Sequence, residues 1–389
     1  MAPPPGTIAF VLSHINKSLQ WLWFAEELHA RGVPHVFVIV ETGRPLLADD
    51  LERLGSPVYV LPHAGFRSHL VNVLRCIRIL RRHRVAVLHT SLPYGNLVGM
   101  LAGALLGIRP RLTTCENPSW AKDQGSRKQE LIDRLTFQLA HRVVVCTVLG
   151  REYLERTFGV PDSKMVLIPH SLKVSDYEGV SPERVERVRA QAGIREGDFV
   201  IGMVARLESW KGHVYAVRAM KRVAARHPNA RLLIFGSDGP ARGELERCIE
   251  DCGLSGVVAY KGFVDDPTAL FRTFDVHVHV PINAIVESAG INIIEGMISG
   301  CAQVLTRSGF SYELARHLDN AWVVGYEDAD AIAEALLALI PDPELRRRLG
   351  ASAARDARRL FDYRVKVDHH LDAYGMASGA AQAGEAPKA

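Results

Sequence analysis

The most informative stretch of this sequence is DVHVHVPINAIVESAGINIIEGMISGCAQVL, which runs from Asp275 to Leu305. Its opening residues have the β-branched, alternating pattern of a buried strand, and Pro281 interrupts that strand. From Gly290 onward the apolar residues recur at helical spacing, so we expect a helix to begin near this glycine. Glu287 therefore lies on a loop beyond the carboxyl end of a strand, and Glu295 lies within the helix.

The start of this helix is a predicted phosphate site. The first turn of a helix has backbone N–H groups without partners, here near Gly290, Ile291 and Asn292, and a glycine has no side chain to block a ligand. Glu287 could then accept hydrogen bonds from hydroxyls held over the helix, and Glu295 could accept them from a vicinal diol such as a ribose. A nucleotide sugar offers both diols with a diphosphate between them. The alternative is that two glutamates stand eight residues apart by chance.

Length and composition limit the class of protein. A chain of 389 residues suggests two domains, and 48% apolar with 23% charged residues is typical of a globular protein. The net charge of +4 is small for this length, which argues against a nucleic-acid binder. We find no apolar run near the ~20 residues that span a bilayer, and the first residues do not have the pattern of a secretory signal. Six cysteines without a Cys-x-x-Cys pair are typical of reduced thiols, so we expect a cytoplasmic protein.

Short apolar runs alternate with helical stretches in two successive series, from 7–12 to 165–169 and from 200–204 to 321–324. This alternation predicts an α/β fold with doubly wound parallel sheets, in which ligands bind beyond the carboxyl ends of the strands. The predicted divisions are a first domain over 1–171, a linker with the first helix of the second half over 172–196, a second domain over 197–360, a C-terminal helix over 361–375 and a disordered tail over 376–389.

The segment 67–84 is a predicted basic amphipathic helix, with arginines set among leucine, valine and isoleucine. Such a helix could lie on an anionic membrane surface, which would make the protein peripheral at the inner face of the cell membrane. The favoured alternative is a solvated helix whose apolar face covers the sheet.

The segment around Glu287 resembles the donor-binding element of family 4 retaining glycosyltransferases of the GT-B fold. The residues that match the family pattern are Glu287, Gly290, Glu295, Met297 and Gly300, and those that depart from it are Ser288, Ala289, Gly296 and Ile298. Further matching segments, in the family's order, are Ala205 to Gly212, in which Ala205 replaces a glycine, Gly236 to Pro240, Val257 to Phe263 and Ser308 to Glu313.

The resemblance implies two Rossmann-like domains that face a central cleft, with the last helix, near Phe361, crossing back to the first domain. It implies that Arg206 and Lys211 contact the donor diphosphate, and that Gly236 and Gly262 lie in loops beside the nucleotide. We expect Arg206, Lys211 and Glu287 to be the catalytic residues, with no cofactor. Because two cationic side chains can neutralise a diphosphate, we also expect no metal. His277 and His279 alternate on a strand, and we expect both to pack.

In the first half the resemblance is general, and the loops depart from the family pattern. The family's first loop is usually glycine-rich, whereas Asn16, Lys17 and Ser18 occupy it here. A histidine often follows the family's fifth strand, where this chain has Glu116. The candidates for contact with the acceptor or the sugar are Asn16, Lys17, Ser18, His89, Glu116 and Asn117, and for His89 and Glu116 the alternative is a structural role.

These observations together predict a metal-independent retaining glycosyltransferase. It would transfer a sugar from a nucleoside diphosphate sugar to an acceptor that is a glycan, a lipid-linked molecule or a small molecule. One alternative is another GT-B fold enzyme, such as a nucleotide-sugar epimerase or a phosphorylase. A second alternative is a non-catalytic subunit that binds a nucleotide sugar.

Overall fold

The computed structural model describes residues 6–116, 127–287 and 289–376, except for the side chains of 66 and 67. The chain divides into two compact units. The first contains the chain up to Ser171 and resumes at Tyr363, and the second extends from Leu172 to Asp362. Most of the predicted tail, from residue 377, lies outside the described residues.

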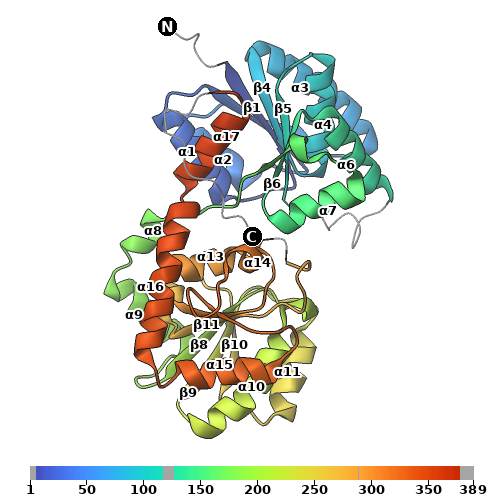
Figure 1. The fold of residues 1–389 in the computed structure, drawn as a ribbon. Helices are drawn as coiled ribbons and strands as arrows, with labels where there is room; N and C mark the ends of the chain where they lie inside the picture. Colours follow the sequence, from blue (N-terminus) through green and yellow to red (C-terminus); the bar gives the residue numbers. More distant parts are fainter. Residues whose placement is uncertain (1–5, 117–126, 288, 377–389) are drawn as a thin grey trace. The chain divides into compact units, whose positions relative to one another are not determined.

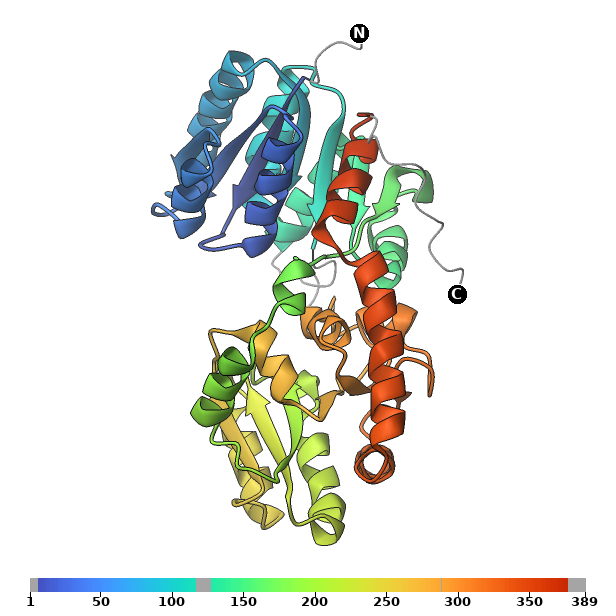
Figure 2. The same cartoon turned by 90° about the vertical axis from the view of Figure 1, so that its left-hand side faces the viewer.

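The first unit is a parallel sheet with helices on both faces (Figures 1 and 2). Its strands are β1 (Thr7–Ser13), β2 (His35–Glu41), β3 (Val58–Pro62), β4 (Val85–Ser91), β5 (Arg111–Cys115), β6 (Arg142–Val145) and β7 (Met165–Leu167), in the order β3-β2-β1-β4-β5-β6-β7. Its helices are α1 (Leu19–Ala30), α2 (Leu46–Arg53), α3 (Phe66–Arg82), α4 (Pro93–Leu105), α6 (Arg127–Leu139), α7 (Val148–Phe158) and α17 (Tyr363–Ala373). The strand order reverses at β1, as in a doubly wound sheet.

The alternation of side chains along β1 explains why both faces of this sheet are covered. Ile8, Phe10 and Leu12 lie in the core beneath α1, whereas Ala9 and Val11 lie in the core beneath α3 and α4. All five are fully buried, and full burial of one large apolar side chain contributes about 1.5–3 kcal/mol.

The last helix, α17, belongs to the first unit. Val367 and Leu371 lie in the same core as α1, and Arg31 forms an ion pair with Asp368. The chain therefore returns to its first sheet after the second unit is complete.

The second unit repeats this architecture with the strand order β10-β9-β8-β11-β12-β13, again all parallel. Its strands are β8 (Phe199–Val204), β9 (Ala230–Phe235), β10 (Val258–Gly262), β11 (Val276–His279), β12 (Ala302–Leu305) and β13 (Trp322–Val323). Its helices are α8 (Ser175–Glu178), α9 (Pro182–Ala192), α10 (His213–Arg226), α11 (Arg242–Asp251), α12 (Pro267–Leu270), α13 (Ile291–Ile298), α14 (Phe310–Leu314), α15 (Ala329–Leu339) and α16 (Pro343–Leu360). The predicted pair of doubly wound α/β sheets is thus confirmed.

Candidate active site

The carboxyl ends of β8 and β11 bring two loops of the second unit together. Gly212 ends the loop after β8 with φ +78, and a Cβ atom there would lie 1.9 Å from the carbonyl oxygen of Val280. Only glycine allows this approach without displacing backbone. The N–H of Ile282 also donates to the carbonyl of Trp210 at 3.0 Å. As a result the loop that carries Lys211 is fixed against the loop that carries Glu287.

Lys211 and Glu287 form a buried ion pair at this junction. The Lys211 Nζ bonds to Glu287 Oε2, and the two side chains are 12% and 8% exposed. The Lys211 ammonium also lies 4.3 Å from the centre of the Trp210 ring, where a cation–π contact supports it. Of the predicted catalytic residues, these two are therefore in direct contact.

His279, which was expected only to pack, is the other residue in contact with Glu287. Its Nε2 lies 3.2 Å from Glu287 Oε2, and its Nδ1 lies 2.7 Å from the Asn292 amide nitrogen. Because an amide nitrogen can only donate, Nδ1 is the acceptor and the ring proton of a neutral His279 is on Nε2, toward the carboxylate. The same Asn292 nitrogen donates to the carbonyl of Val204 at 2.7 Å. The Asn292 side chain thus connects α13 to the ends of β8 and β11.

These contacts determine the charge of Glu287. Burial by itself would raise its pKa, but the contact with the His279 ring and the charge of Lys211 lower the pKa to about 2. Burial lowers the pKa of His279, so this ring is neutral. Glu287 is consequently an anion across the physiological pH range.

The helix predicted after Glu287 is α13, and Gly290 precedes it with φ +74. Within the described residues, the N–H groups of Ile291 and Asn292 have no backbone acceptor, and the N–H of Ile293 donates to Gly290 at 2.9 Å. Two free N–H groups at a helix start can bind an anion such as a phosphate.

Glu295 has different surroundings from Glu287. Its Oε1 accepts a hydrogen bond of 2.9 Å from the hydroxyl of Tyr177 in α8. Burial raises the Glu295 pKa to about 6, although the Tyr177 bond acts in the opposite direction. Tyr177 was not among the predicted residues. It precedes Glu295 by 118 positions, so no local pattern could have indicated it.

The remaining donor candidates lie at the same edge of the second sheet. Arg206 is exposed and its Nη2 lies 3.1 Å from Glu208 Oε1. The N–H of Gly236 donates to the carbonyl of Gly262 at 2.9 Å, and the hydroxyl of Tyr260 donates to Gly236 at 2.8 Å. The loops after β8, β9 and β10 are therefore neighbours, and the exposed Arg206 side chain lies on the first of them.

In the first unit, the loop after β1 has mainly local contacts. Asn16 Oδ1 accepts from the N–H of Leu46 at 3.2 Å, and the Ser18 hydroxyl caps α1 by accepting from Trp21 at 3.4 Å. Lys17 is exposed, and no acceptor contacts it within the described residues. Of the three predicted residues in this loop, Lys17 is therefore the one whose side chain makes no hydrogen bond to the described residues.

The other first-unit candidates differ in accessibility. His89 is fully buried; its Nδ1 lies 2.6 Å from the Tyr374 hydroxyl and its Nε2 lies 2.7 Å from the Thr114 hydroxyl. Burial lowers its pKa to about 3, so its placement favours the structural alternative. Glu116 is half-buried and accepts from the Ser91 hydroxyl at 2.8 Å. Asn117 lies outside the described residues.

No cluster of three or more His, Cys, Asp or Glu side chains that could hold a metal occurs in the part of the chain that the structure describes. The Asp-x-Asp pair of Asp328 and Asp330 has other partners: Asp328 caps α15 through Ala331, and Asp330 pairs with Arg222 at 2.6 Å. Nor is any described helix long and apolar enough to cross a membrane.

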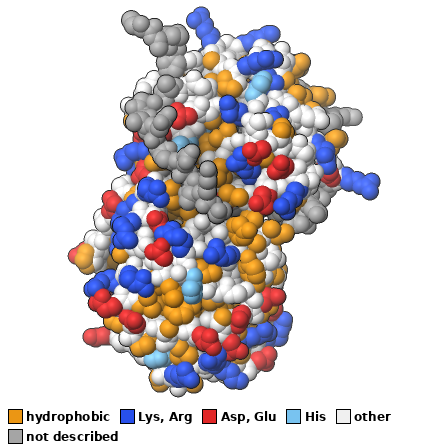
Figure 3. Space-filling model, in the orientation of Figure 1, with side chains coloured by type: hydrophobic (Ala, Val, Ile, Leu, Met, Phe, Trp, Pro, Cys, Tyr) orange, Lys and Arg blue, Asp and Glu red, His pale blue; other side chains and the backbone are white. Residues whose placement is uncertain are grey.

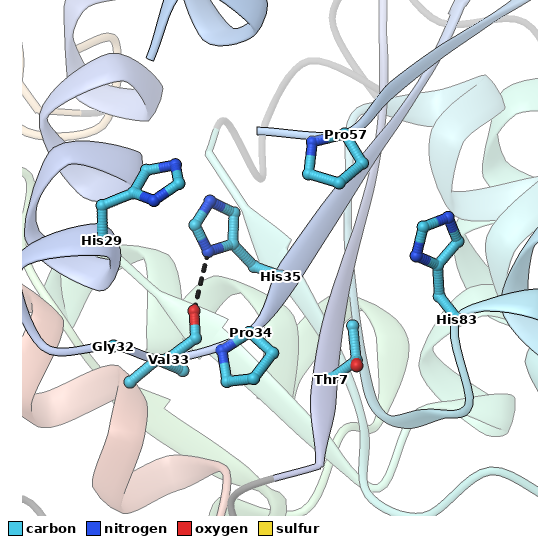
Figure 4. Close-up of a pocket in the computed structure, with 8 residues that line it drawn as sticks. All are labelled: Thr7, His29, Gly32, Val33, Pro34, His35, Pro57 and His83. Atoms are coloured by element: carbon cyan, nitrogen blue, oxygen red, sulfur yellow. Dashed lines mark hydrogen bonds between the residues drawn. The ribbon is translucent and has the colours of Figure 1, made fainter. Parts of the chain in front are cut away.

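A hollow of about 410 Å³ lies at the opposite, amino-terminal edge of the first sheet (Figure 4). His29 and His35 in its wall are both hydrogen bonded to the Ser56 hydroxyl, at 3.0 and 2.9 Å. Parallel sheets of this type bind ligands at the carboxyl edge, so this hollow is not part of the candidate site.

Comparison with known proteins supports the predicted fold. Residues 22–175 match the family described as Glycosyltransferase Family 4, and residues 184–356 match the family described as Glycosyl transferases group 1. The structure of HepE from Anabaena, in complex with UDP, superposes with a TM-score of 0.80 at 18% identity, over 95% of this chain and 99% of HepE. In class, the fold is therefore that of the GT-B glycosyltransferases, and each half of the chain matches a glycosyltransferase family.

More particularly, the two matches together span most of the chain, and one of them is the family that the motifs resemble. EpsD of Bacillus subtilis, whose name describes it as a glycosyltransferase, is 29% identical over 198 residues, which are 51% of this chain and 51% of EpsD. A D-inositol 3-phosphate glycosyltransferase of Corynebacterium kroppenstedtii is 24% identical over 85% of this chain and 74% of its own length. The match to EpsD thus spans about half of that relative.

Proposed function

We propose that the protein is a metal-independent retaining glycosyltransferase. In this proposal the second unit binds a nucleoside diphosphate sugar and the first unit binds the acceptor. The observation that carries the proposal is the meeting of Lys211, Glu287 and the free N–H groups of α13 at one sheet edge. This sheet edge offers a fixed cation and helix N–H donors to a diphosphate. It also offers a fixed anion to the hydroxyls of a sugar. The UDP bound to the structurally similar HepE supports a nucleotide donor.

The proposed chemistry needs stabilisation of charge more than a protein nucleophile. Departure of the diphosphate places negative charge on its oxygens, and Arg206, Lys211 and the N–H groups of Ile291 and Asn292 are the donors for that charge. Glu287 holds Lys211 in position and accepts from the sugar. The acceptor hydroxyl gives its proton to the departing phosphate as the new bond forms on the same face, so the anomeric configuration is retained.

The first test is a thermal-shift screen of UDP, GDP, ADP and dTDP sugars with and without their free nucleotides. A ligand at 100 times its dissociation constant stabilises the folded protein by ~2.7 kcal/mol, which is easily measured. The donor that binds is then followed by NMR during slow hydrolysis, and the first sugar released should keep the donor's anomeric configuration. Binding without any hydrolysis or transfer favours the non-catalytic subunit, and conversion of the donor to a different nucleotide sugar favours an epimerase.

The acceptor side of the proposal involves Lys17 and Glu116. Lys17 is exposed after β1, and Glu116 follows β5 with Ser91 as a partner. Alanine at either position should impair transfer while leaving nucleotide affinity nearly unchanged. Equal losses in nucleotide affinity and transfer would assign the residue to the donor site or to folding.

A peripheral membrane contact is a separate proposal, supported by the outer face of α3. Leu70, Val71 and Leu74 are 65%, 48% and 56% exposed, and Arg75 and Arg78 beside them are exposed as well. In Figure 3 basic and hydrophobic side chains are interspersed over the region where Figure 1 draws α3. Binding to vesicles that contain an anionic lipid, lost on Leu70→Ser with Leu74→Ser, supports the contact. Absence of binding favours a solvated helix face.

A further inference from the structure

Tyr177 is a buried tyrosine whose hydroxyl reaches the carboxylate expected to hold a ribose. It lies in the short helix α8 and is 3% exposed. Its hydroxyl donates to Glu295 Oε1 at 2.9 Å. Its carbonyl accepts from Arg272 Nη2 at 2.9 Å, so the backbone on which this side chain stands is also fixed.

The segment around Tyr177 is held by a second set of bonds. Arg184 of α9 makes a two-point contact with Asp266, with Nε at 2.9 Å from Oδ2 and Nη2 at 2.7 Å from Oδ1. Asp266 also caps α12 by accepting from the N–H of Ala269 at 3.1 Å. Two parallel charged hydrogen bonds define an orientation as well as a distance. The phenol is thus presented to Glu295 from a rigid support.

We propose that Tyr177 is a positioning residue for the nucleoside end of the donor. Its hydroxyl fixes the Glu295 carboxylate through Oε1 and leaves Oε2 to accept hydrogen bonds from the vicinal diol of a ribose. This inference rests on the proposed function, because it assigns Glu295 to a nucleotide. It adds a residue from α8, far from the motifs that indicated the donor site, to the determinants of nucleotide affinity.

The phenol also influences the protonation state of Glu295. Burial raises the Glu295 pKa to about 6, and the bond from Tyr177 opposes that rise because a donor favours the ionised form. A protonated carboxyl group loses acceptor capacity and presents a hydrogen instead. Removal of the hydroxyl should therefore move the loss of diol binding toward neutral pH.

The charged neighbours do not change this expectation. Burial is the main cause that raises the pKa of the Tyr177 hydroxyl far above its ordinary value. Glu295 is the next cause, and Asp176 and Asp266 act in the same direction. The phenol thus remains a neutral donor. Arg272 contacts the Tyr177 carbonyl, and the Arg184 side chain is bound to Asp266. Tyr177 is the side chain through which α8 acts on Glu295 among the described contacts.

The experiment measures the affinity of free UDP, GDP, ADP and dTDP by calorimetry between pH 5.5 and pH 8.5, for the wild type, Tyr177→Phe and Glu295→Gln. For the tightest of these ligands, Tyr177→Phe should bind nearly as well as the wild type at pH 8.5 and about three to ten times more weakly at pH 6.5, since a shift of one pKa unit changes protonation tenfold. Glu295→Gln cannot ionise and reports the pH dependence of the ligand's own phosphate. Adding Tyr177→Phe to Glu295→Gln should not change the nucleotide affinity further.

Tyr215→Phe is the matched control. It also removes a tyrosine hydroxyl from a glutamate, Glu327, but on an exposed part of α10. It should leave nucleotide affinity and its pH profile unchanged. A Tyr177→Phe protein with wild-type affinity at every pH overturns the inference, and so does a loss of affinity that is equal at every pH, whatever the melting temperature. If the wild type binds none of the four nucleotides, the proposed function itself fails.

Discussion

Glu287 and Glu295 are eight residues apart on one loop and helix, yet their pKa values are shifted in opposite directions. Burial raises the pKa of each. At Glu287 the contact with the His279 ring and the charge of Lys211 outweigh burial, and the pKa falls to about 2. At Glu295 the opposing contact is the Tyr177 hydroxyl, and the pKa rises to about 6. The difference shows that the partners, which come from other strands and helices, decide the sign of the shift.

The two surroundings correspond to two kinds of role. Glu287 has Lys211 and His279 at the same carboxylate oxygen, so its position and its negative charge are both fixed. A carboxyl group that titrates near pH 6 with one neutral donor responds to its ligand and to pH. In the proposed function the first orients charge at the reacting end of the donor, and the second contributes to binding of the nucleoside end.

The largest expected effect comes from breaking the Lys211–Glu287 pair. Lys211→Ala should lower the turnover rate by ~100 to 1,000-fold, because an ammonium gains most when the diphosphate oxygen becomes more negative in the transition state. Steady-state kinetics with a protein of verified melting temperature measure this. Lys211→Met, which keeps the aliphatic stem over Trp210, is the control for packing. A near wild-type turnover rate with only a raised KM would contradict the electrostatic role.

The next effect is on stability. The Glu295 pKa rises from an ordinary 4.5 to about 6, so the stabilisation from its bound proton is present below pH 4.5 and lost as pH rises through 6. This difference is worth about 2 kcal/mol. Relative to Glu295→Gln, the wild type should therefore lose about 2 kcal/mol of unfolding free energy between pH 4.5 and pH 7. Urea unfolding at the two pH values measures it, and parallel changes in both proteins would refute the shift.

The pKa shift of Glu287 has the opposite sign, since its pKa lies at about 2, below the ordinary 4.5. Its contribution is present above pH 4.5 and lost as pH falls toward 2. Between pH 4.5 and pH 7 the difference between the wild type and Glu287→Gln should thus change by only about 0.4 kcal/mol, and in the opposite direction, which makes this variant the control for the Glu295 measurement.

A smaller effect separates the two ends of the donor. Glu295→Gln should lower the affinity for the free nucleoside diphosphate and for the complete donor equally, by about tenfold at pH 8. This is the usual size of the effect of a hydrogen bond to a charged group. Glu287→Gln should lower the affinity for the complete donor and leave the affinity for the free nucleotide unchanged. Calorimetry with both ligands makes the comparison. Reversal of the pattern would exchange the roles of the two carboxylates.

The smallest expected effect is that of a chelator. If Arg206 and Lys211 neutralise the diphosphate, transfer or donor hydrolysis should continue unchanged in EDTA. Loss of activity that magnesium or manganese restores would mean that a metal ion shares the diphosphate with these side chains.

Much of the fold followed from local pattern. The alternating run 275–280 and the helical spacing after Gly290 correspond to β11 and α13, because burial on one or both faces imposes a period on the residues themselves. The family motifs likewise directed attention to the sheet edge where Lys211 and Glu287 meet.

His279 and Tyr177 were beyond that kind of reasoning. His279 has the place of an ordinary buried strand residue, and only the position of Asn292 assigns its ring proton to the side of Glu287. His89 was a candidate for ligand contact by its place at the end of a strand, but Tyr374 and Thr114 occupy both of its nitrogens.

The sequence by itself determined the order of strands and helices and the family motifs, because periodicity and short-range spacing are properties of neighbours along the chain. Tertiary structure decided the charge and the partners of the two carboxylates. The pKa of a buried group depends on desolvation and on donors within a few ångströms, and at this site those donors come from α8, β11 and the loop after β8.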